Sequence, residues 1–123
     1  MSDKDLLQGS WEVVGFFRAG VPDPDEIGDG CWFEGDTILK GNEDAAWAHP
    51  FRLGEFHGLR TIEIWSDQPA WHYRQIAAYH IRGEQLLICY DPESPLTPPS
   101  SFDSTPENGY VLEVHRRTNK PAP

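Results

Sequence analysis

The sequence predicts an all-β fold, an antiparallel up-and-down barrel of about eight strands preceded by a short helical turn. Two observations favour this class. Short runs rich in β-branched and aromatic residues are separated by turn formers, among them 11 Gly and 11 Pro. Several runs also alternate polar and apolar residues, as strands with one buried face do. Closure into a barrel removes exposed sheet edges, and a two-sheet sandwich is the alternative.

The predicted elements follow one another through short connections. A helical turn is expected over 3–8, with Ser2 or Asp3 as its cap, and a further turn is expected after Pro24. A Gly-Asp pair at 35–36 joins the second and third strands in a tight hairpin. The strands are expected at 11–18, 31–34, 37–40, 46–53, 59–66, 71–82, 85–90 and 109–116.

Alternation assigns the faces of the later strands. In the strand over 71–82, one face carries two Arg and two His and is expected to meet water. The other face carries Tyr73, Gln75 and Tyr79 and is expected to point inward. In the last strand, Leu112 and Val114 are expected inward. The segment 91–108 is a long irregular loop rather than a linker, because a further strand follows it.

The length and the cysteines indicate one self-sufficient unit. A chain of 123 residues forms a single domain, 1–123, of which 118–123 is expected to be a frayed tail. Cys31 and Cys89 both fall in predicted strands and lack the spacing of a zinc site, so buried free thiols are expected. A disulfide between neighbouring strands is the alternative. No staple by metal or disulfide is needed at this size.

The net charge of −10 limits the partners. It argues against a nucleic-acid backbone and against an anionic membrane surface, whereas a basic protein would be attracted. The first residues contain no apolar signal-peptide core, and no apolar run reaches membrane-spanning length. A cytoplasmic location is therefore expected, and the oligomeric state stays open.

Three segments together resemble a bacterial family of lipocalin-like domains. They are Leu7-Gln8-Gly9-Ser10-Trp11-Glu12-Val13-Val14, Phe33-Glu34-Gly35-Asp36 and Tyr79-His80-Ile81-Arg82-Gly83-Glu84-Gln85-Leu86-Leu87-Ile88-Cys89-Tyr90. The Pro-rich loop and the final Leu112-Glu113-Val114-His115-Arg116-Arg117 follow in the same order, so the resemblance covers nearly the whole chain. It implies a lipocalin-like barrel and no particular reaction.

The same segments resemble the wider calycin pattern of a Gly-x-Trp in the first strand and an Arg after the last. In that pattern the Arg packs over the indole at the closed end of the barrel. The resemblance implies that Trp11 pairs here with Arg116 or Arg117. Such a pair closes the barrel, which leaves any binding site at the opposite end.

Aromatic and amide side chains on the predicted inner faces suggest a ligand pocket. An eight-stranded barrel has room either for packed side chains or for one small ligand, and pockets combine apolar walls with a few polar groups. We therefore expect a small, largely apolar molecule to bind inside the barrel, with a filled core as the alternative. The expected lining residues are Phe33, Trp47, His49, Phe51, Tyr73, Gln75, Tyr79 and Tyr90.

Catalysis is open at this point. His49 or Tyr79 could transfer a proton during isomerisation or cyclisation of the ligand, because burial can move a pKa toward neutrality. No cofactor fingerprint is present. A metal site is not expected, because His72 and His80 would lie about 26 Å apart along one strand, and neither His49 nor His57 belongs to a ligand motif.

A protein-interaction module is the second class of function. The loop over 23–29 carries several carboxylates, and it could bind a basic partner, as an immunity-type inhibitor does. This loop lacks the oxygen spacing of a calcium site. Glu34 and Asp36 are assigned to the hairpin turn.

Overall fold

The computed structural model describes residues 1–42, 45–66 and 73–121. Each predicted strand is present, and a two-residue strand is added to the first. The elements are α1 (Asp3–Leu7), β1 (Gly9–Arg18), β2 (Val21–Pro22), η1 (Pro24–Glu26), β3 (Gly30–Glu34), β4 (Thr37–Gly41), β5 (Ala46–Phe56), β6 (Leu59–Ser66), β7 (Tyr73–Arg82), β8 (Gln85–Tyr90) and β9 (Val111–Thr118).

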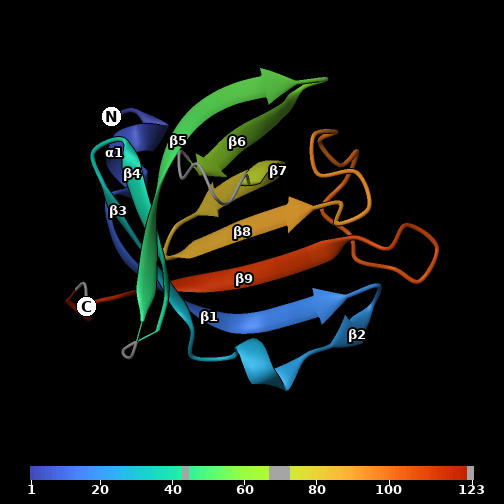
Figure 1. Cartoon of the computed structure of the whole chain (residues 1–123), viewed down its shortest axis with the longest axis horizontal. Helices are drawn as coiled ribbons and strands as arrows, with labels where there is room; N and C mark the ends of the chain where they lie inside the picture. The colour runs from blue at the N-terminus through green and yellow to red at the C-terminus, as the bar shows by residue number, and fades with distance from the viewer. Residues whose placement is uncertain (43–44, 67–72, 122–123) are drawn as a thin grey trace.

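The strands form one antiparallel sheet that closes on itself. Neighbours in the sheet follow the order β2-β1-β3-β4-β5-β6-β7-β8-β9, and β1 also pairs with β9. The result is an eight-stranded up-and-down barrel, with β2 as a short addition beside β1 (Figure 1). The predicted fold class is confirmed. The first two residues of the strand that the sequence placed at 71–82 lie outside the described residues.

Helix α1 and the Trp11 side chain fill one end of the barrel. Ser2 and Asp5 form a capping box at the start of the helix. Leu7 and Trp11 are both fully buried, and the indole Nε1 of Trp11 donates to the carbonyl of Leu7 over 2.9 Å. This is the closed end. Among the described residues, no helix has the length and apolar character required to span a membrane.

Arg117, rather than Arg116, covers this indole. The Arg117 guanidinium lies 4.1 Å from the centre of the Trp11 ring and donates to the carbonyls of Gln8 and Leu6. Arg116 points away and faces Glu12 on the surface, with 3.8 Å between Nη2 and Oε2. The two arginines are adjacent in sequence, so their side chains leave opposite faces of β9.

The inner face of β9 is polar, which differs from the sequence-based expectation. Val111, Glu113 and His115 are buried, whereas Leu112 and Val114 are only partly buried and lie on the other face. The prediction that Leu112 and Val114 point inward is wrong. The register of closure is the reason, because Trp11 pairs with Arg117, and a period of two then turns positions 115, 113 and 111 inward.

A β-bulge on β1 shapes the interior opposite β9. The pairing with β9 shifts between Val13 and Gly15, so Val14 is left out of register and is 41% exposed. As a result Val13 and Phe16 are both buried although three positions separate them. They pack with Val111 in a small apolar cluster that is distinct from the main core around Trp11.

The long loop after β8 covers the outer face of β7 and β8. Its Pro95 carbonyl accepts from the Ile76 amide over 2.7 Å, and Pro99 is fully buried. Beneath it Ala78 and Cys89 are completely buried. The expectation that the outer face of β7 meets water is therefore wrong at Ala78, although Arg74, His80 and Arg82 on that face are exposed.

The end of the chain stays attached to the barrel as far as Lys120. The carbonyl of Lys120 accepts from Ser10 Oγ over 2.7 Å and from the indole of Trp32 over 3.2 Å. These contacts hold the start of the segment for which the sequence predicts fraying. The N-terminus and the last described residues lie on the side of the barrel that carries α1 (Figure 1).

Candidate ligand-binding site inside the barrel

A cavity of about 180 Å³ lies inside the barrel. Side chains from both apolar clusters form part of its wall, and charged groups form the rest. At the end of the barrel far from α1, the cavity is bordered by the end of β1, the η1 loop, the start of β3 and the end of β4. The apolar wall consists of Val13, Phe16, Ile38, Ile64 and Ile88, and the polar lining consists of Arg18, Glu26, Asp29, Cys31, Lys40, Gln75, Tyr90, Glu113 and His115.

Glu113 and His115 form a buried pair on the inner face of β9. Nε2 of His115 lies 2.9 Å from Oε1 of Glu113, and the side chains are only 3% and 8% exposed respectively. Burial lowers the pKa of His115, but the neighbouring Cys31 and Glu113 raise it, and the balance is a pKa of about 10. His115 is therefore a cation at neutral pH, and it donates its Nε2 proton to the carboxylate.

Lys40 on β4 supplies a second positive charge to this group. Burial lowers the pKa of Lys40, but Glu113 together with Tyr73, Tyr90 and Cys31 outweighs that effect, and the pKa of Lys40 is raised. Burial raises the pKa of Glu113 in turn, while Lys40 and the hydrogen bond from His115 bring it below its ordinary value. Two cations thus face one carboxylate in the deep part of the cavity.

Hydrogen-bond donors exceed acceptors in this cluster. Within the described ranges, Nδ1 of the buried His115 has no hydrogen-bond partner, and the side chain of Lys40 forms no ion pair or hydrogen bond. Both residues line the cavity. Because a buried donor without an acceptor costs about 1–3 kcal/mol, a bound molecule that offers an acceptor would be stabilised here.

Four of the residues expected to bind ligand gather beside the cavity. Gln75 and Tyr90 line it directly. The Tyr73 hydroxyl donates to Gln75 Oε1 over 2.9 Å, and the ring of His49 lies 5.8 Å from the Tyr73 ring. Burial raises the pKa of Tyr90 to about 12 and lowers that of His49, and the charge of Lys40 lowers the latter further. His49 therefore stays neutral at physiological pH.

The other expected residues lie elsewhere. Phe33 packs edge-on against Phe51, 5.3 Å between ring centres, in the main core. Trp47 is 61% exposed at the start of β5. The Tyr79 hydroxyl donates to Asp3 Oδ2 over 2.7 Å, and Arg60 donates to the same oxygen, so this tyrosine joins α1 to the barrel. None of these four residues, Phe33, Phe51, Trp47 and Tyr79, lines the cavity.

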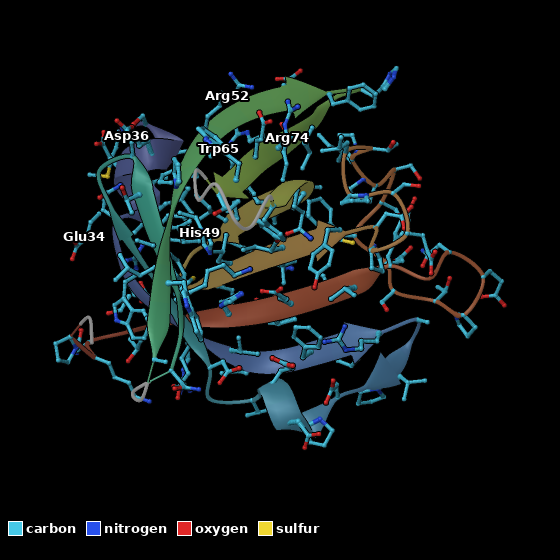
Figure 2. The ribbon with its side chains drawn as sticks, viewed as in Figure 1. Glu34, Asp36, His49, Arg52, Trp65 and Arg74 are labelled. Carbon is cyan, nitrogen blue, oxygen red and sulfur yellow. The ribbon has the colours of Figure 1, made fainter. Side chains whose placement is uncertain are left out.

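The acidic loop after β1 is tied to the barrel by its own ion pairs. Arg18 at the end of β1 donates to Asp23 over 3.1 Å and lies 3.6 Å from Glu26. Next to the bulge, the Val13 amide donates to the Asp29 carbonyl and the Val13 carbonyl accepts from the Gly28 amide. Two of the four carboxylates in the predicted interaction loop, Asp23 and Glu26, thus already share the charge of Arg18. Glu34 is the last residue of β3, and Asp36 lies in the turn that leads to β4, on the side of the barrel that carries α1 (Figure 2).

The sequence-based reasoning missed the charged residues that distinguish this cavity, Lys40, Glu113 and His115. A signal for them exists in the last strand. Every second residue of that strand lies on the same face, and one face carries Glu113, His115 and Arg117. Pairing Arg117 with the inward-facing Trp11 therefore turns this face toward the interior. For Lys40 there is no comparable local signal, because a lysine at the end of a strand is ordinarily exposed.

Cys31 and Cys89 are buried and free, as predicted. Among the described residues, no group of three or more His, Cys, Asp and Glu side chains is arranged to hold a metal ion. Comparison with protein families, curated proteins and solved structures finds no match. The fold and the cavity thus define a small closed β-barrel able to hold a ligand.

Proposed function

We propose that this protein binds a small organic acid inside the barrel, with the carboxylate between Lys40 and His115. The observation that carries the proposal is the pair of unsatisfied donors in a cavity that also has an apolar wall. The apolar wall suits the small apolar molecule that the sequence predicts. The donors Lys40 and His115 add the requirement that this molecule carries an anionic acceptor.

The cavity limits the size of the molecule. A protein cavity of about 150 Å³ lined by apolar side chains accommodates benzene, so about 180 Å³ is room for one ring with a short substituent. Benzoate is a suitable probe, since it combines a six-membered ring with a carboxylate. Benzyl alcohol is the matched neutral probe of similar size.

Isothermal titration calorimetry with these two probes tests the proposal. Benzoate is expected to bind and benzyl alcohol to bind at least about tenfold more weakly, because a charge-assisted hydrogen bond contributes about 1.5–3 kcal/mol. Ile88→Phe fills the cavity and should abolish binding, whereas Leu87→Phe on the other face of β8 should leave it unchanged. Equal binding to these two variants, or no binding of benzoate to the wild type, would contradict the proposal.

Proton transfer to the bound molecule is a second candidate function, and the placement of His115 favours it. His115 is a buried cation that lines the cavity, and its Nδ1 has no hydrogen-bond partner in the described part of the chain, so this atom is available to act as a general acid. His49 and Tyr79, the residues that the sequence pointed to, bond elsewhere. An isomerase of this kind would lose turnover on His115→Gln and keep it on Tyr79→Phe.

A further inference from the structure

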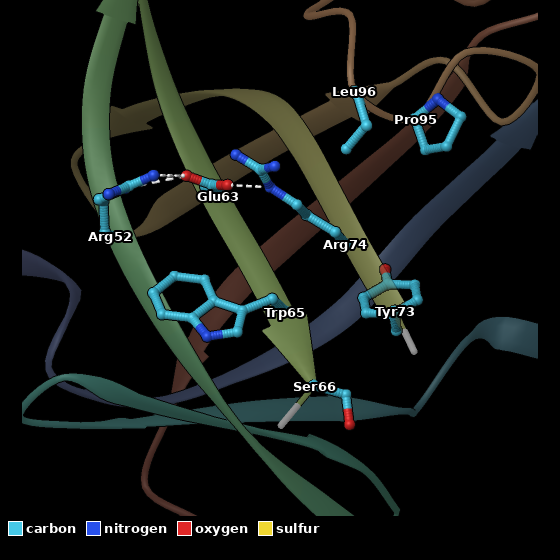
Figure 3. Close-up of a pocket in the computed structure, with 8 residues that line it drawn as sticks. All are labelled: Arg52, Glu63, Trp65, Ser66, Tyr73, Arg74, Pro95 and Leu96. Atoms are coloured by element: carbon cyan, nitrogen blue, oxygen red, sulfur yellow. Dashed lines mark hydrogen bonds and ion pairs between the residues drawn. The ribbon is translucent and has the colours of Figure 1, made fainter. Parts of the chain in front are cut away.

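A groove of about 640 Å³ runs over the outside of the barrel, separate from the interior cavity. Its floor is the outer face of β6 and β7, and one wall is the loop that follows β8 (Figure 3). The groove falls in the size range of small-molecule sites, about 300–1,000 Å³. The residues that line it are Arg52, Glu63, Trp65, Ser66, Tyr73, Arg74, Pro95 and Leu96.

Two arginines share one glutamate in this groove. Arg52 on β5 donates to Glu63 Oε1 through Nε over 2.9 Å and through Nη2, and Arg74 on β7 donates to Glu63 Oε2 through Nε. The Glu63 side chain is 10% exposed, whereas those of Arg52 and Arg74 are 67% and 54% exposed. Glu63 thus fixes both guanidinium groups and leaves their outer edges accessible (Figure 3).

The charge of this group is not balanced. Burial raises the pKa of Glu63, but both arginines lower it and the net pKa is lowered, so the carboxylate is ionised at neutral pH. Two guanidinium groups against one carboxylate leave a local charge of +1 in a chain whose net charge is −10. Toward the described residues, Nη1 and Nη2 of Arg74 donate no hydrogen bonds. These two atoms form the edge that binds a carboxylate in a bidentate manner.

Apolar surface adjoins the free edge of Arg74. Trp65 follows Glu63 by two positions on β6 and lies on the same outer face, with the Arg52 guanidinium 5.8 Å from its ring centre. Leu96 on the opposite wall is 52% exposed. Figure 2 shows Arg52, Trp65 and Arg74 gathered in the same region of the barrel, away from Glu34 and Asp36. The half-buried Trp65 and the exposed Leu96, beside the uncompensated charge of the arginine pair, fit a flat apolar anion.

We propose that this groove is a second binding site, for an aromatic monocarboxylate too large for the interior cavity. The carboxylate binds the outer edge of Arg74, and the rings lie between Trp65 and Leu96. A single negative charge matches the residual +1 of the arginine pair. The site uses none of the charged interior residues Lys40, Glu113 and His115. The proposal can therefore be tested independently of the proposed interior function.

The probe for the experiment is 2-naphthoate, with 2-naphthylmethanol as its neutral counterpart. Binding is followed by calorimetry and by the indole N–H signal of Trp65 in ¹⁵N-edited spectra, assigned through Trp65→Phe. We expect 2-naphthoate to bind and to shift that signal. The affinity for 2-naphthylmethanol should be at least about tenfold lower than that for 2-naphthoate, because the bidentate ion pair is missing.

Arg74→Gln and Arg82→Gln form the matched pair of variants. Both arginines are exposed on the outer face of β7, but only Arg74 lines the groove. Arg74→Gln should weaken 2-naphthoate about tenfold or more, and Arg82→Gln should change it less than twofold. Circular dichroism verifies that both variants are folded.

Three results would overturn the second site. They are equal losses in the two arginine variants, equal binding of the charged and neutral probes, and a Trp65 signal that does not move. The interior variant Ile88→Phe separates the two proposals, because it should abolish benzoate binding and leave 2-naphthoate binding intact. Loss of 2-naphthoate in Ile88→Phe would place that molecule inside the barrel and also overturn the second site.

Discussion

His115 and Glu113 lie two positions apart on β9, with Nε2 of the first 2.9 Å from Oε1 of the second, inside a closed barrel. Their neighbours across the cavity lining are Cys31 and Lys40. A charged pair in this position is costly unless it is well compensated. Its presence distinguishes the interior from an ordinary apolar core, and the predictions below begin from it.

The imidazole of His115 should titrate far above the ordinary range. Its pKa rises from 6.5 to about 10 on folding, so its contribution to stability is complete below pH 6.5 and is lost as the pH rises toward 10. The free energy of unfolding should therefore fall over this interval in the wild type and fall less in His115→Gln. NMR titration of the ring protons and urea unfolding at each pH measure both effects. A ring that titrates near pH 6.5 would contradict this prediction.

Replacing Glu113 by Gln should destabilise the fold by about 3 kcal/mol, because it leaves the positive charges of His115 and Lys40 uncompensated in the interior. Glu12→Gln is the control, since Glu12 pairs with Lys120 and Arg116 on the surface and should cost less than about 1 kcal/mol. Urea unfolding at pH 7 compares them. Equal losses of unfolding free energy in the two variants would show that the buried Glu113–His115 pair contributes no more to stability than a surface ion pair.

The pH dependence of Glu113 has the opposite sign to that of His115. Its folded pKa lies below the ordinary 4.5, so its contribution is present above pH 4.5 and disappears as the pH falls through the folded value. Acid unfolding of Glu113→Gln should consequently show a weaker dependence on pH below 4.5 than the wild type shows. Parallel acid-unfolding curves for the two proteins would exclude this role.

Closure of the barrel should depend on Trp11 and on only one of the two adjacent arginines. Trp11→Ala is expected to cost about 3–5 kcal/mol, as truncation of a buried aromatic side chain does. Arg117→Ala removes the cover of the indole and two hydrogen bonds to carbonyls, at a cost of about 1–3 kcal/mol. Arg116→Ala should cost less than about 1 kcal/mol. Thermal unfolding distinguishes these values, and the reverse order of the arginines would refute the assignment.

Tyr79 should matter for stability and not for ligand binding. Tyr79→Phe removes the hydrogen bond to Asp3 that joins α1 to β7, which is worth about 1–2 kcal/mol. Benzoate affinity should stay within twofold of the wild type, because Tyr79 lies outside the cavity lining. Calorimetry with benzoate gives the answer, and a large loss of affinity with unchanged stability would point to a role at the site.

The order and number of the strands could be predicted because they depend on local signals. Gly35 and Asp36 mark a tight turn, and alternation along β6 follows the pleat of a half-buried strand. The closed-end Trp11 could be predicted through resemblance to the calycin pattern. These features require no knowledge of which strand lies beside which.

The interior site could not be predicted in the same way. Alternation separates Leu112 and Val114 from Glu113 and His115, but it does not say which pair faces inward, and hydrophobicity alone favours the wrong one. Only the pairing of β1 with β9 decides the question. The bulge at Val14 and the cover over Ala78 are likewise set by distant segments, the η1 loop and the loop after β8.

The most direct measurement of the interior site is an isotope-filtered NOE spectrum of benzoate bound to the ¹³C-labelled protein. The proposal predicts NOEs from the ring protons to methyl groups that line the cavity, those of Val13, Ile64 and Ile88. They should vanish in Ile88→Phe and persist in Leu87→Phe. NOEs only to Leu96 in the outer groove, or to no methyl group at all, would contradict a binding site inside the barrel.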